Sequence, residues 1–329
     1  MSTRAPYVTV LTAARNARRF LPDAVQSIQR QTYDDWEYVI VNDASEDDTG
    51  DIVERLARTD DRIRALHRSS CGGPFVAAND GLRVARGKYI VQLDSDDLAV
   101  PHRIERQLAY LEARPRLRAC AALVQVLTDD GLRDHGVGRL PTLVHSMKWR
   151  VCVRPGLAHS SACVERSALL ELGGYGNLRL SEDLRLWCQL ARFDWLGVVP
   201  EVLVYWRSHD GQLTKLEDDE LEWRAIEVVR EHLSELSGEN WASDDVARLY
   251  SVGLRPMPLR AGLDIISRFD SAWRRDSGLT PAERRELRRL VRRVRFEHIR
   301  AVARDRVEFV PASGPFLRLW RRLKHFASP

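Results

Sequence analysis

The alternation between two hydrophobic periodicities constrains the fold of this chain more than any other feature of its sequence. Apolar, β-branched runs such as Tyr7–Thr12 and Trp36–Val41 alternate with stretches whose apolar residues recur at helical spacing, as in Phe20–Gln31. Parallel strands need a crossover connection, which is usually a helix. The order strand, helix, strand, helix therefore predicts an α/β protein with a Rossmann-like, mostly parallel central sheet and helices on both faces.

The rest of the chain extends this pattern and then leaves it. Further strands are expected at Ile63–His67, Lys88–Leu93, Ala119–Leu127, His159–Val164 and Trp195–Trp206. Further helices are expected at Thr49–Ala57, from Pro74 through Leu82, and at Pro101–Glu112, Glu165–Leu172 and Ser181–Arg192. Residues 128–138 are expected to form a polar loop, and the chain beyond Lys215 is charged and helical. We therefore expect an α/β domain over residues 1–214 and a helical, Arg-rich region over residues 215–329.

Cysteine usage and apolar run length narrow the class of protein. The five cysteines are scattered and no pair has CxxC spacing, which favours reduced thiols in a cytoplasmic protein over a zinc site or a disulfide framework. No apolar run is long enough to cross a membrane, and residues 1–6 lack the apolar core of a signal peptide. The sequence thus predicts a cytoplasmic protein with no membrane-spanning helix.

The C-terminal segment gathers basic charge. Residues 281–329 contain 14 Lys and Arg against 5 Asp and Glu. Within residues 313–326 one helical face would be apolar and aromatic and the other rich in arginine, which is the pattern of an interfacial membrane helix. A helix that docks on its own domain or on a second subunit has the same pattern. We expect peripheral contact with the inner face of the membrane as one interpretation, and no nucleic-acid binding, because no recognised motif accompanies the charge.

Polar residues gather where the predicted strands end. Thr12, Asn42-Asp43 and Asp94–Asp97 each close an apolar strand, and ligands bind at the carboxyl ends of strands in open α/β sheets. The Asp-x-Asp spacing would place Asp94 and Asp96 on the same side of an extended backbone. Hard carboxylate oxygens suit Mg²⁺ or Mn²⁺, and such ions bridge to phosphate oxygens. The alternative is a polar turn in which one aspartate caps the next helix, and we assign a capping role to Asp97.

Two further groups of residues have both a structural and a chemical interpretation. Ser181-Glu182-Asp183 precedes an amphipathic helix, where Ser181 would be the N-cap and the acids would be stabilised by the helix dipole. A carboxylate held there, near the glycine-rich segment 173–176, could instead act as a general base. His209 follows the last apolar strand, and it is either an ordinary surface residue or a further ligand for Mn²⁺.

The ordered set of motifs resembles the family 2 glycosyltransferases, which have the GT-A nucleotide-diphosphosugar transferase fold. The resemblance covers about residues 7–214 and rests on the order and separation of its motifs rather than on any one of them. In chain order these motifs are Val8–Asn16, Ser27–Tyr33, Val39–Ser45, Ala77–Leu82, Gly87–Ile90, Leu93–Asp97, Gly173–Tyr175 and Glu182–Trp187.

The resemblance implies a role for each candidate residue. Residues 1–100 would hold the nucleotide-sugar and residues 101–214 the acceptor. Asp43 would hydrogen-bond the nucleobase, commonly uracil, and Thr12 would line the base and ribose. Asp94 would lie nearer the ribose and Asp96 would be the more direct metal ligand. Further assignments are Asn79 and Ser95 in the nucleotide-sugar site, His209 near the metal and diphosphate, and Asp183 as catalytic base.

The implied reaction is an inverting single displacement assisted by Mg²⁺ or Mn²⁺. A nucleotide-diphosphosugar, with a UDP-sugar expected, would donate its sugar to a hydroxyl of a saccharide, a polysaccharide or a lipid-linked acceptor. Two alternatives are a catalytically silent nucleotide- or sugar-binding module of the same fold, and a nucleotidyltransferase of related fold. The second usually has a Gly-rich loop and a lysine after the first strand, and Thr12–Asn16 has neither. Departures from the family pattern, such as Ala13 and Arg15 in the first loop in place of Pro and Tyr and Ala78 in place of Arg, leave the donor nucleotide open.

Overall fold

The computed structural model describes residues 5–133, 144–153, 157–176, 181–212, 218–251 and 258–307. The chain forms two compact units, Met1–His232 and Leu233–Pro329, and the boundary between them falls within helix α9 (Asp218–Ser237). The segment 313–326, with its predicted amphipathic helix, lies outside the described residues. Within the described residues, no helix has both the length and the apolar character that crossing a membrane would require.

The first unit is built on a mixed sheet, and the described residues contribute nine strands to it. In sheet order these are β3 (Ile63–His67), β2 (Trp36–Asn42), β1 (Val8–Ala14), β4 (Tyr89–Gln92), β8 (Cys163–Glu165), β6 (Ala119–Thr128), β9 (Leu196–Arg207) and β5 (Leu98–Ala99), with β7 (Gly131–Arg133) paired to β6. Strands β3, β2, β1 and β4 run parallel, as do β6 and β9. Strand β8 lies antiparallel between β4 and β6, so the sheet is mostly parallel, as predicted, but not entirely so.

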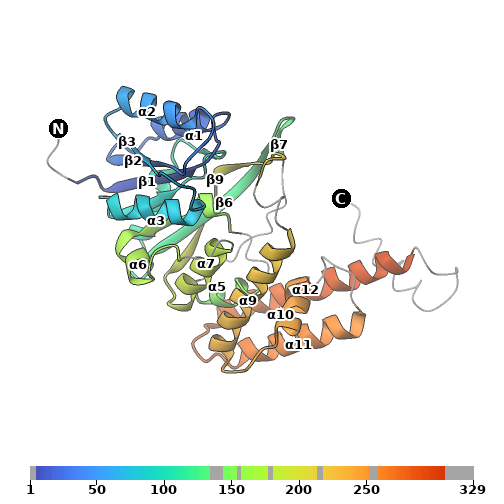
Figure 1. Ribbon diagram of the computed structural model, residues 1–329. Helices are drawn as coiled ribbons and strands as arrows, with labels where there is room; N and C mark the ends of the chain where they lie inside the picture. The colour runs from blue at the N-terminus through green and yellow to red at the C-terminus, as the bar shows by residue number, and fades with distance from the viewer. Residues whose placement is uncertain are drawn as a thin grey trace. The chain divides into compact units, whose positions relative to one another are not determined.

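Helices cover both faces of the parallel strands (Figure 1). Helices α1 (Leu21–Gln29) and α2 (Thr49–Thr59) lie on one side of β1, β2 and β3, and α3 (Pro74–Val84) lies on the other. Alternate side chains of a strand point to opposite faces, so β1 buries Val8 and Val10 in the core that contains α1 and α2, and Leu11 lies against Gly81 of α3. Within the described residues this unit also contains the helices α4 (Arg103–Glu112), α5 (Val144–Arg150), α6 (Arg166–Glu171) and α7 (Glu182–Arg192), together with the first part of α9.

Three local expectations are corrected by the structure. His159–Ser161 form a single 3₁₀ turn, η1, and the strand predicted from His159 begins only at Cys163. The predicted polar loop after Thr128 contains the short strand β7, which forms a hairpin with β6. Asp94–Asp97 is a tight turn, closed by a hydrogen bond from the Asp97 N–H to the Asp94 carbonyl (3.2 Å), rather than an extended continuation of β4.

The second unit is helical, as the charged sequence beyond Lys215 predicts. Beyond the end of α9, its described helices are α10 (Ser243–Ser251), α11 (Leu259–Arg274) and α12 (Pro281–Val307). The start of α12 has a capping box, because the Thr280 N–H donates to the Glu283 carboxylate at 2.8 Å and the Glu283 N–H donates to the Thr280 hydroxyl at 3.3 Å. Pro281 follows at the first helical position, where its missing N–H is not needed.

Candidate active site

Two buried hydroxyl groups, those of Thr12 and Ser160, hydrogen-bond the backbone where β4 leads into the following turn. The Thr12 hydroxyl donates to the Leu93 carbonyl (2.6 Å) and is also bonded to the Tyr38 hydroxyl (2.8 Å), and all of these groups are buried. One residue further on, the Asp94 N–H donates to the Ser160 hydroxyl at 2.8 Å. These contacts fix the last residue of the apolar run and the first residue of the turn. The turn therefore presents its carboxylates in a defined place even though its backbone is not extended.

Asp94 faces an imidazole. Its Oδ1 lies 3.4 Å from Nδ1 of His159, and the Asp94 side chain is 41% exposed. Burial acts to raise the pKa of Asp94, but the hydrogen bonds from His159 and Ser160 and the nearby charges outweigh it, so this pKa lies below its ordinary value. Asp94 is thus a carboxylate that stays ionised beside a histidine.

Asp96 pairs with the predicted histidine. Its Oδ2 lies 2.9 Å from Nε2 of His209, and its backbone carbonyl accepts a hydrogen bond from the Arg207 guanidinium at 2.8 Å. Burial and the charge of Asp94 raise the pKa of Asp96 above its ordinary value, although the contact with His209 acts the other way. The end of β9 therefore meets the turn after β4.

Asp97 does not cap a helix, contrary to the prediction. Helix α4 begins at Arg103 with His102 as its N-cap, and the segment between is taken up by strand β5, which pairs with β9. Asp97 is 1% exposed and accepts a hydrogen bond from the Arg207 N–H at 2.8 Å. Burial and its two acidic neighbours raise the pKa of Asp97 well above its ordinary value. Its role is to tie the turn to β9.

Asp183 lies at the start of α7, and it shares its surroundings with the turn after β4. Its Oδ1 accepts the Leu184 N–H at 2.7 Å. Burial raises the pKa of Asp183, the positive charge of His159 lowers it, and the negative charge of Asp94 adds to the rise. Residues remote in sequence are therefore close enough to influence one another's ionisation. Ser181 is the N-cap, as predicted, but it has a left-handed backbone (φ 64°) and its side chain makes no capping hydrogen bond.

Asn79 holds the glycine-rich segment in place. The Tyr175 N–H donates to Asn79 Oδ1 at 2.9 Å, and Asn79 Nδ2 donates to the Gly176 carbonyl at 2.8 Å. Gly173 and Gly174 end helix α6 in a Schellman motif, with the Gly174 N–H bonded to the Leu169 carbonyl and the Gly173 N–H to the Leu170 carbonyl. Gly174 has a φ of +77°, and a Cβ there would lie 2.3 Å from Asn79 Oδ1. Both hydrogen-bonding ends of the Asn79 amide are thus used within the protein.

The carboxylate of Asp43 is also hydrogen-bonded by groups of the protein itself. Its carboxylate accepts the Gly72 N–H (2.9 Å) and the Gly73 N–H (2.8 Å), and Arg68 Nε lies 2.8 Å from its Oδ1. The side chain is almost fully buried. The loop between β3 and α3 therefore closes over Asp43 at the end of β2. Ser95, in contrast, lies in the middle of the turn after β4, and its hydroxyl makes no hydrogen bond to the described residues.

The carboxylates and His209 suit a divalent cation that is bound together with a phosphate group. No group of three or more His, Cys, Asp or Glu side chains within the described residues is close enough to hold a metal by itself. Asp96 and His209 place a hard oxygen and an imidazole nitrogen side by side, and Asp94 offers a partly exposed carboxylate next to them. Mg²⁺ typically uses one or two carboxylates and completes its shell with water and substrate phosphates, and imidazole is a common ligand of transition metals. The donor set fits such an ion.

Two residues of this region were missed by the sequence analysis. His159 lies next to Asp94, and its ring centroid is 5.5 Å from those of both Phe75 and Tyr175. Its Nε2 is buried with no hydrogen-bond partner among the described residues. Arg103 is fully buried and donates to the carbonyls of Gln92 (2.7 Å) and Ala162 (3.2 Å), which joins β4 to η1. Arg103 lies on the apolar face of the predicted helix 101–112, so its burial could have been predicted from its position. Nothing in the sequence around His159 sets that residue apart.

Comparison with known proteins places the chain in a family. The model of the family described as glycosyl transferase family 2 matches residues 9–170. The putative glycosyltransferase EpsE of Bacillus subtilis is 30% identical over 221 residues, which cover 64% of this chain and 76% of EpsE. The chain belongs to glycosyltransferase family 2. It is by this membership a glycosyltransferase, and the family resemblance seen in its motifs is confirmed.

Two further comparisons concern narrower regions or the fold alone. The UDP-Glc:α-D-GlcNAc-diphosphoundecaprenol β-1,3-glucosyltransferase WfaP of Escherichia coli is 37% identical over 105 residues, covering 32% of this glycosyltransferase and 41% of WfaP. The mannosyltransferase PcManGT of Pyrobaculum calidifontis, solved in complex with GDP-Man and Mn²⁺, superposes with a TM-score of 0.57 at 18% identity, covering 92% of this chain and 86% of that one. The GT-A fold with a helical C-terminal part is thereby confirmed.

Proposed function

We propose that this glycosyltransferase moves a sugar, with inversion, from a nucleotide-diphosphate donor to a hydroxyl of a saccharide, polysaccharide or lipid-linked acceptor. A UDP-sugar is the expected donor. The observation that carries the proposal is the electrostatic influence of Asp94, on the turn after β4, on Asp183 at the start of α7, together with the pairing of Asp96 with His209. An acidic pair that suits a metal and a diphosphate would thus lie near a separate, partly buried carboxylate, and an inverting displacement needs these two parts.

The donor half of the proposed site consists of Asp94, Ser95, Asp96 and His209. Asp96 and His209 would hold Mg²⁺ or Mn²⁺, with Asp94 as a further ligand nearer the ribose. The ion would supply neutralisation of the charge that grows on the departing diphosphate. PcManGT, whose fold is similar, was solved with Mn²⁺ and a nucleotide-sugar, which supports this part of the proposal.

Asp183 is the proposed general base. It would take the proton of the acceptor hydroxyl at a carboxylate oxygen as that hydroxyl attacks the anomeric carbon. The burial that raises its pKa makes the carboxylate a stronger proton acceptor. His159 would position the two halves, because it contacts Asp94 and its charge acts on Asp183.

Two predicted nucleotide contacts acquire a supporting role in this proposal. The hydrogen bonds of Thr12 and Asn79 are satisfied within the protein, so these residues would shape the site from behind rather than touch the donor. Asp43 would read the nucleobase through the acceptor capacity that Gly72, Gly73 and Arg68 leave on its carboxylate oxygens.

The proposed setting is the synthesis of a cell-envelope polysaccharide. The name of WfaP describes transfer from UDP-Glc to a sugar linked to diphosphoundecaprenol, which is one acceptor of the lipid-linked class proposed here. We place the reaction in the cytoplasm, in line with the free cysteines of the described residues.

Donor binding tests the proposal directly. Thermal unfolding is measured with UDP-, GDP- and TDP-sugars, with and without Mn²⁺. One nucleotide class should stabilise the protein in a metal-dependent way, by about 2.7 kcal/mol at a ligand concentration 100 times the Kd. Asp96→Ala should abolish this stabilisation, whereas Asp51→Ala, which removes an exposed acid on α2, should keep it.

Two outcomes would count against the proposal. The first is the absence of stabilisation by any nucleotide-sugar with metal. The second is full stabilisation of Asp96→Ala. Turnover of the bound donor would separate an enzyme from a silent binding module of the same fold, because only the enzyme releases the nucleoside diphosphate.

A further inference from the structure

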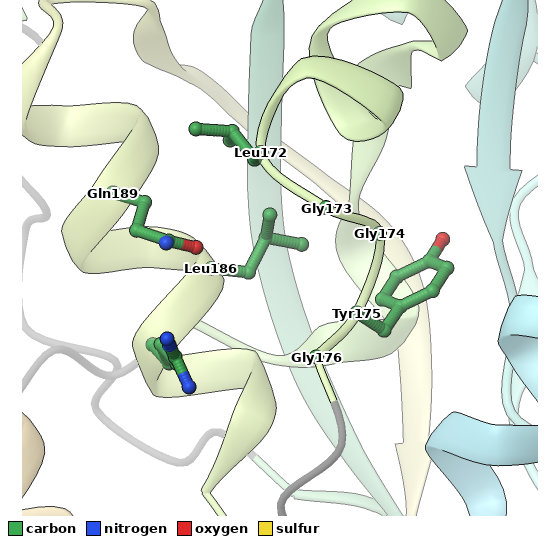
Figure 2. Close-up of a pocket in the computed structure, with 8 residues that line it drawn as sticks. Leu172, Gly173, Gly174, Tyr175, Gly176, Leu186 and Gln189 are labelled. Atoms are coloured by element: carbon green, nitrogen blue, oxygen red, sulfur yellow. The ribbon is translucent and has the colours of Figure 1, made fainter.

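A cavity of about 390 Å³ lies beside the proposed catalytic helix and is not part of the donor site. The glycine-rich turn after α6 forms one wall and helix α7 forms the other (Figure 2). In this view Leu186 and Gln189 of α7 face the turn, and the ring of Tyr175 points to the far side of it. The lining residues are Leu172, Gly173, Gly174, Tyr175, Gly176, Arg185, Leu186 and Gln189.

Two polar side chains that line this cavity have no hydrogen-bonding partner among the described residues. Arg185 and Gln189 are partly buried and one helical turn apart, so they lie on the same face of α7. Neither side chain makes a hydrogen bond or an ion pair with any residue that the structure describes. A partly buried guanidinium without a partner costs free energy, and proteins usually satisfy such a group. The cavity therefore holds one full positive charge and one amide available to a ligand.

The opposite wall leaves room for that ligand. A Cβ built on Gly173 or on Gly176 would meet no atom within 4 Å, so both positions border open space. The glycine-rich turn is held rigidly by Asn79 and by its Schellman motif, so the cavity has a defined shape before anything binds.

We propose that this cavity is an acceptor subsite that binds an anionic group, a phosphate or a carboxylate, carried by the acceptor saccharide. The guanidinium of Arg185 can donate two parallel hydrogen bonds to such a group, and the Gln189 amide can donate a third. This inference rests on the proposed function, because it assigns the cavity to the acceptor from its place on the same helix as Asp183. Arg185 is two residues from Asp183 and leaves the helix on a different side. A separation of two residues is about 200° around the helix, so the anionic group would be carried on a part of the acceptor away from the reacting hydroxyl.

The binding test needs neither a donor nor turnover. Isothermal titration of the full chain in EDTA compares three probes of similar size: glucose 1-phosphate, glucuronate and neutral glucose. Both anions should bind at least about tenfold more tightly than glucose, and Arg185→Gln should raise their Kd about tenfold to a hundredfold. Arg192→Gln is the matched control, because it removes an exposed arginine from the same helix outside the cavity.

The location is checked without any variant. In the wild-type chain labelled with ¹⁵N-glycine, the amide resonances of Gly173, Gly174 and Gly176 should shift as either anion is added. A stronger response to glucose 1-phosphate would indicate a phosphate-bearing acceptor, and a stronger response to glucuronate would indicate a uronic acid. The inference is overturned if the anions bind no better than glucose, if Arg185→Gln and Arg192→Gln have equal effects, or if these glycine resonances stay in place.

A donor measurement separates this inference from the proposed function. Arg185→Gln should leave the affinity for the nucleotide within about twofold of wild type, because the cavity lies outside the donor site. If the nucleotide affinity falls as far as the anion affinity, the cavity belongs to the donor and the inference is wrong. If no nucleotide binds to the wild type while the anions do, the proposed function fails and the anion site remains.

Discussion

Replacing Thr12 by valine removes one hydroxyl from beneath the acidic turn while keeping the shape of the side chain. The hydroxyl donates to the Leu93 carbonyl at 2.6 Å, so its hydrogen is in use. The Tyr38 hydroxyl, at 2.8 Å, must therefore donate its own hydrogen to the Thr12 oxygen. In Thr12→Val both the carbonyl and the phenol lose these buried partners.

The magnitude follows from two unsatisfied groups. Each buried polar group that loses its partner costs about 1–3 kcal/mol, so the free energy of unfolding should fall by about 2–6 kcal/mol. Thr12→Ser keeps both hydrogen bonds and deletes one buried methyl group, at a cost of about 1 kcal/mol. The two variants should therefore differ by at least about 1 kcal/mol, with valine the less stable, even though it retains more apolar volume.

Urea unfolding monitored by tryptophan fluorescence measures both variants against wild type. Because Leu93 immediately precedes the acidic turn, the valine variant should also bind the nucleotide donor more weakly than the serine variant. Equal stability of the two variants would refute the reasoning. So would a serine variant that is stable but loses donor binding, because Thr12 would then act through direct contact with the donor.

Three further predictions concern the glycine-rich turn, a buried acid and the proposed base. Gly174→Ala should destabilise the protein by at least about 1 kcal/mol in urea unfolding, because a Cβ there meets Asn79 and alanine disfavours a positive φ; equal stability would contradict this. Glu37 is buried, but its hydrogen bonds to Arg86 and Arg64 overcome that burial and lower its pKa. Its contribution is therefore present above the unfolded pKa of about 4.5 and is lost as pH falls through the lower folded pKa. The stability advantage of wild type over Glu37→Gln should shrink across that range, and a pH-independent difference would argue against the pairing. Burial raises the pKa of Asp183, so kcat/KM should fall on the acid side of its pH profile with an apparent pKa above the ordinary value of an aspartate. An apparent pKa at or below that ordinary value would count against Asp183 as the base.

The fold could be predicted where one face of an element is apolar. Leu21, Ala24, Val25 and Ile28 recur at helical spacing, and all four are buried in α1. Strands β1, β2 and β4 of the parallel half are buried on both faces, so they appear in the sequence as largely apolar runs. Strand β8 was predicted too long, from His159, and its antiparallel direction was not predicted, because both depend on its pairing with β4 and β6 rather than on its own pattern.

The candidate site could be predicted only in part, for a related reason. Asp94 and Asp96 follow a strand with clear periodicity, so their place at the sheet edge could be inferred from topology. His209, which contacts Asp96, and Asp183 were assigned only through the family resemblance. The hydrogen bonds that Asp43 and Asn79 make within the protein could not be predicted. They are made to backbone N–H and carbonyl groups of distant turns, and such groups are present in every sequence. The Asp97 cap was wrong because short-range spacing ignores the pairing of β5 with β9.

Steady-state transfer by Asp183→Asn tests the central claim most directly. The substitution keeps the shape of the side chain and removes its capacity to accept a proton from the acceptor. With the donor identified by thermal shift, Asp183→Asn should bind nucleotide and metal as wild type does, while kcat for release of the nucleoside diphosphate to acceptor falls by about 10²–10⁴-fold. Transfer at the wild-type rate by this folded variant would contradict the assignment of Asp183 and, with it, the proposed mechanism.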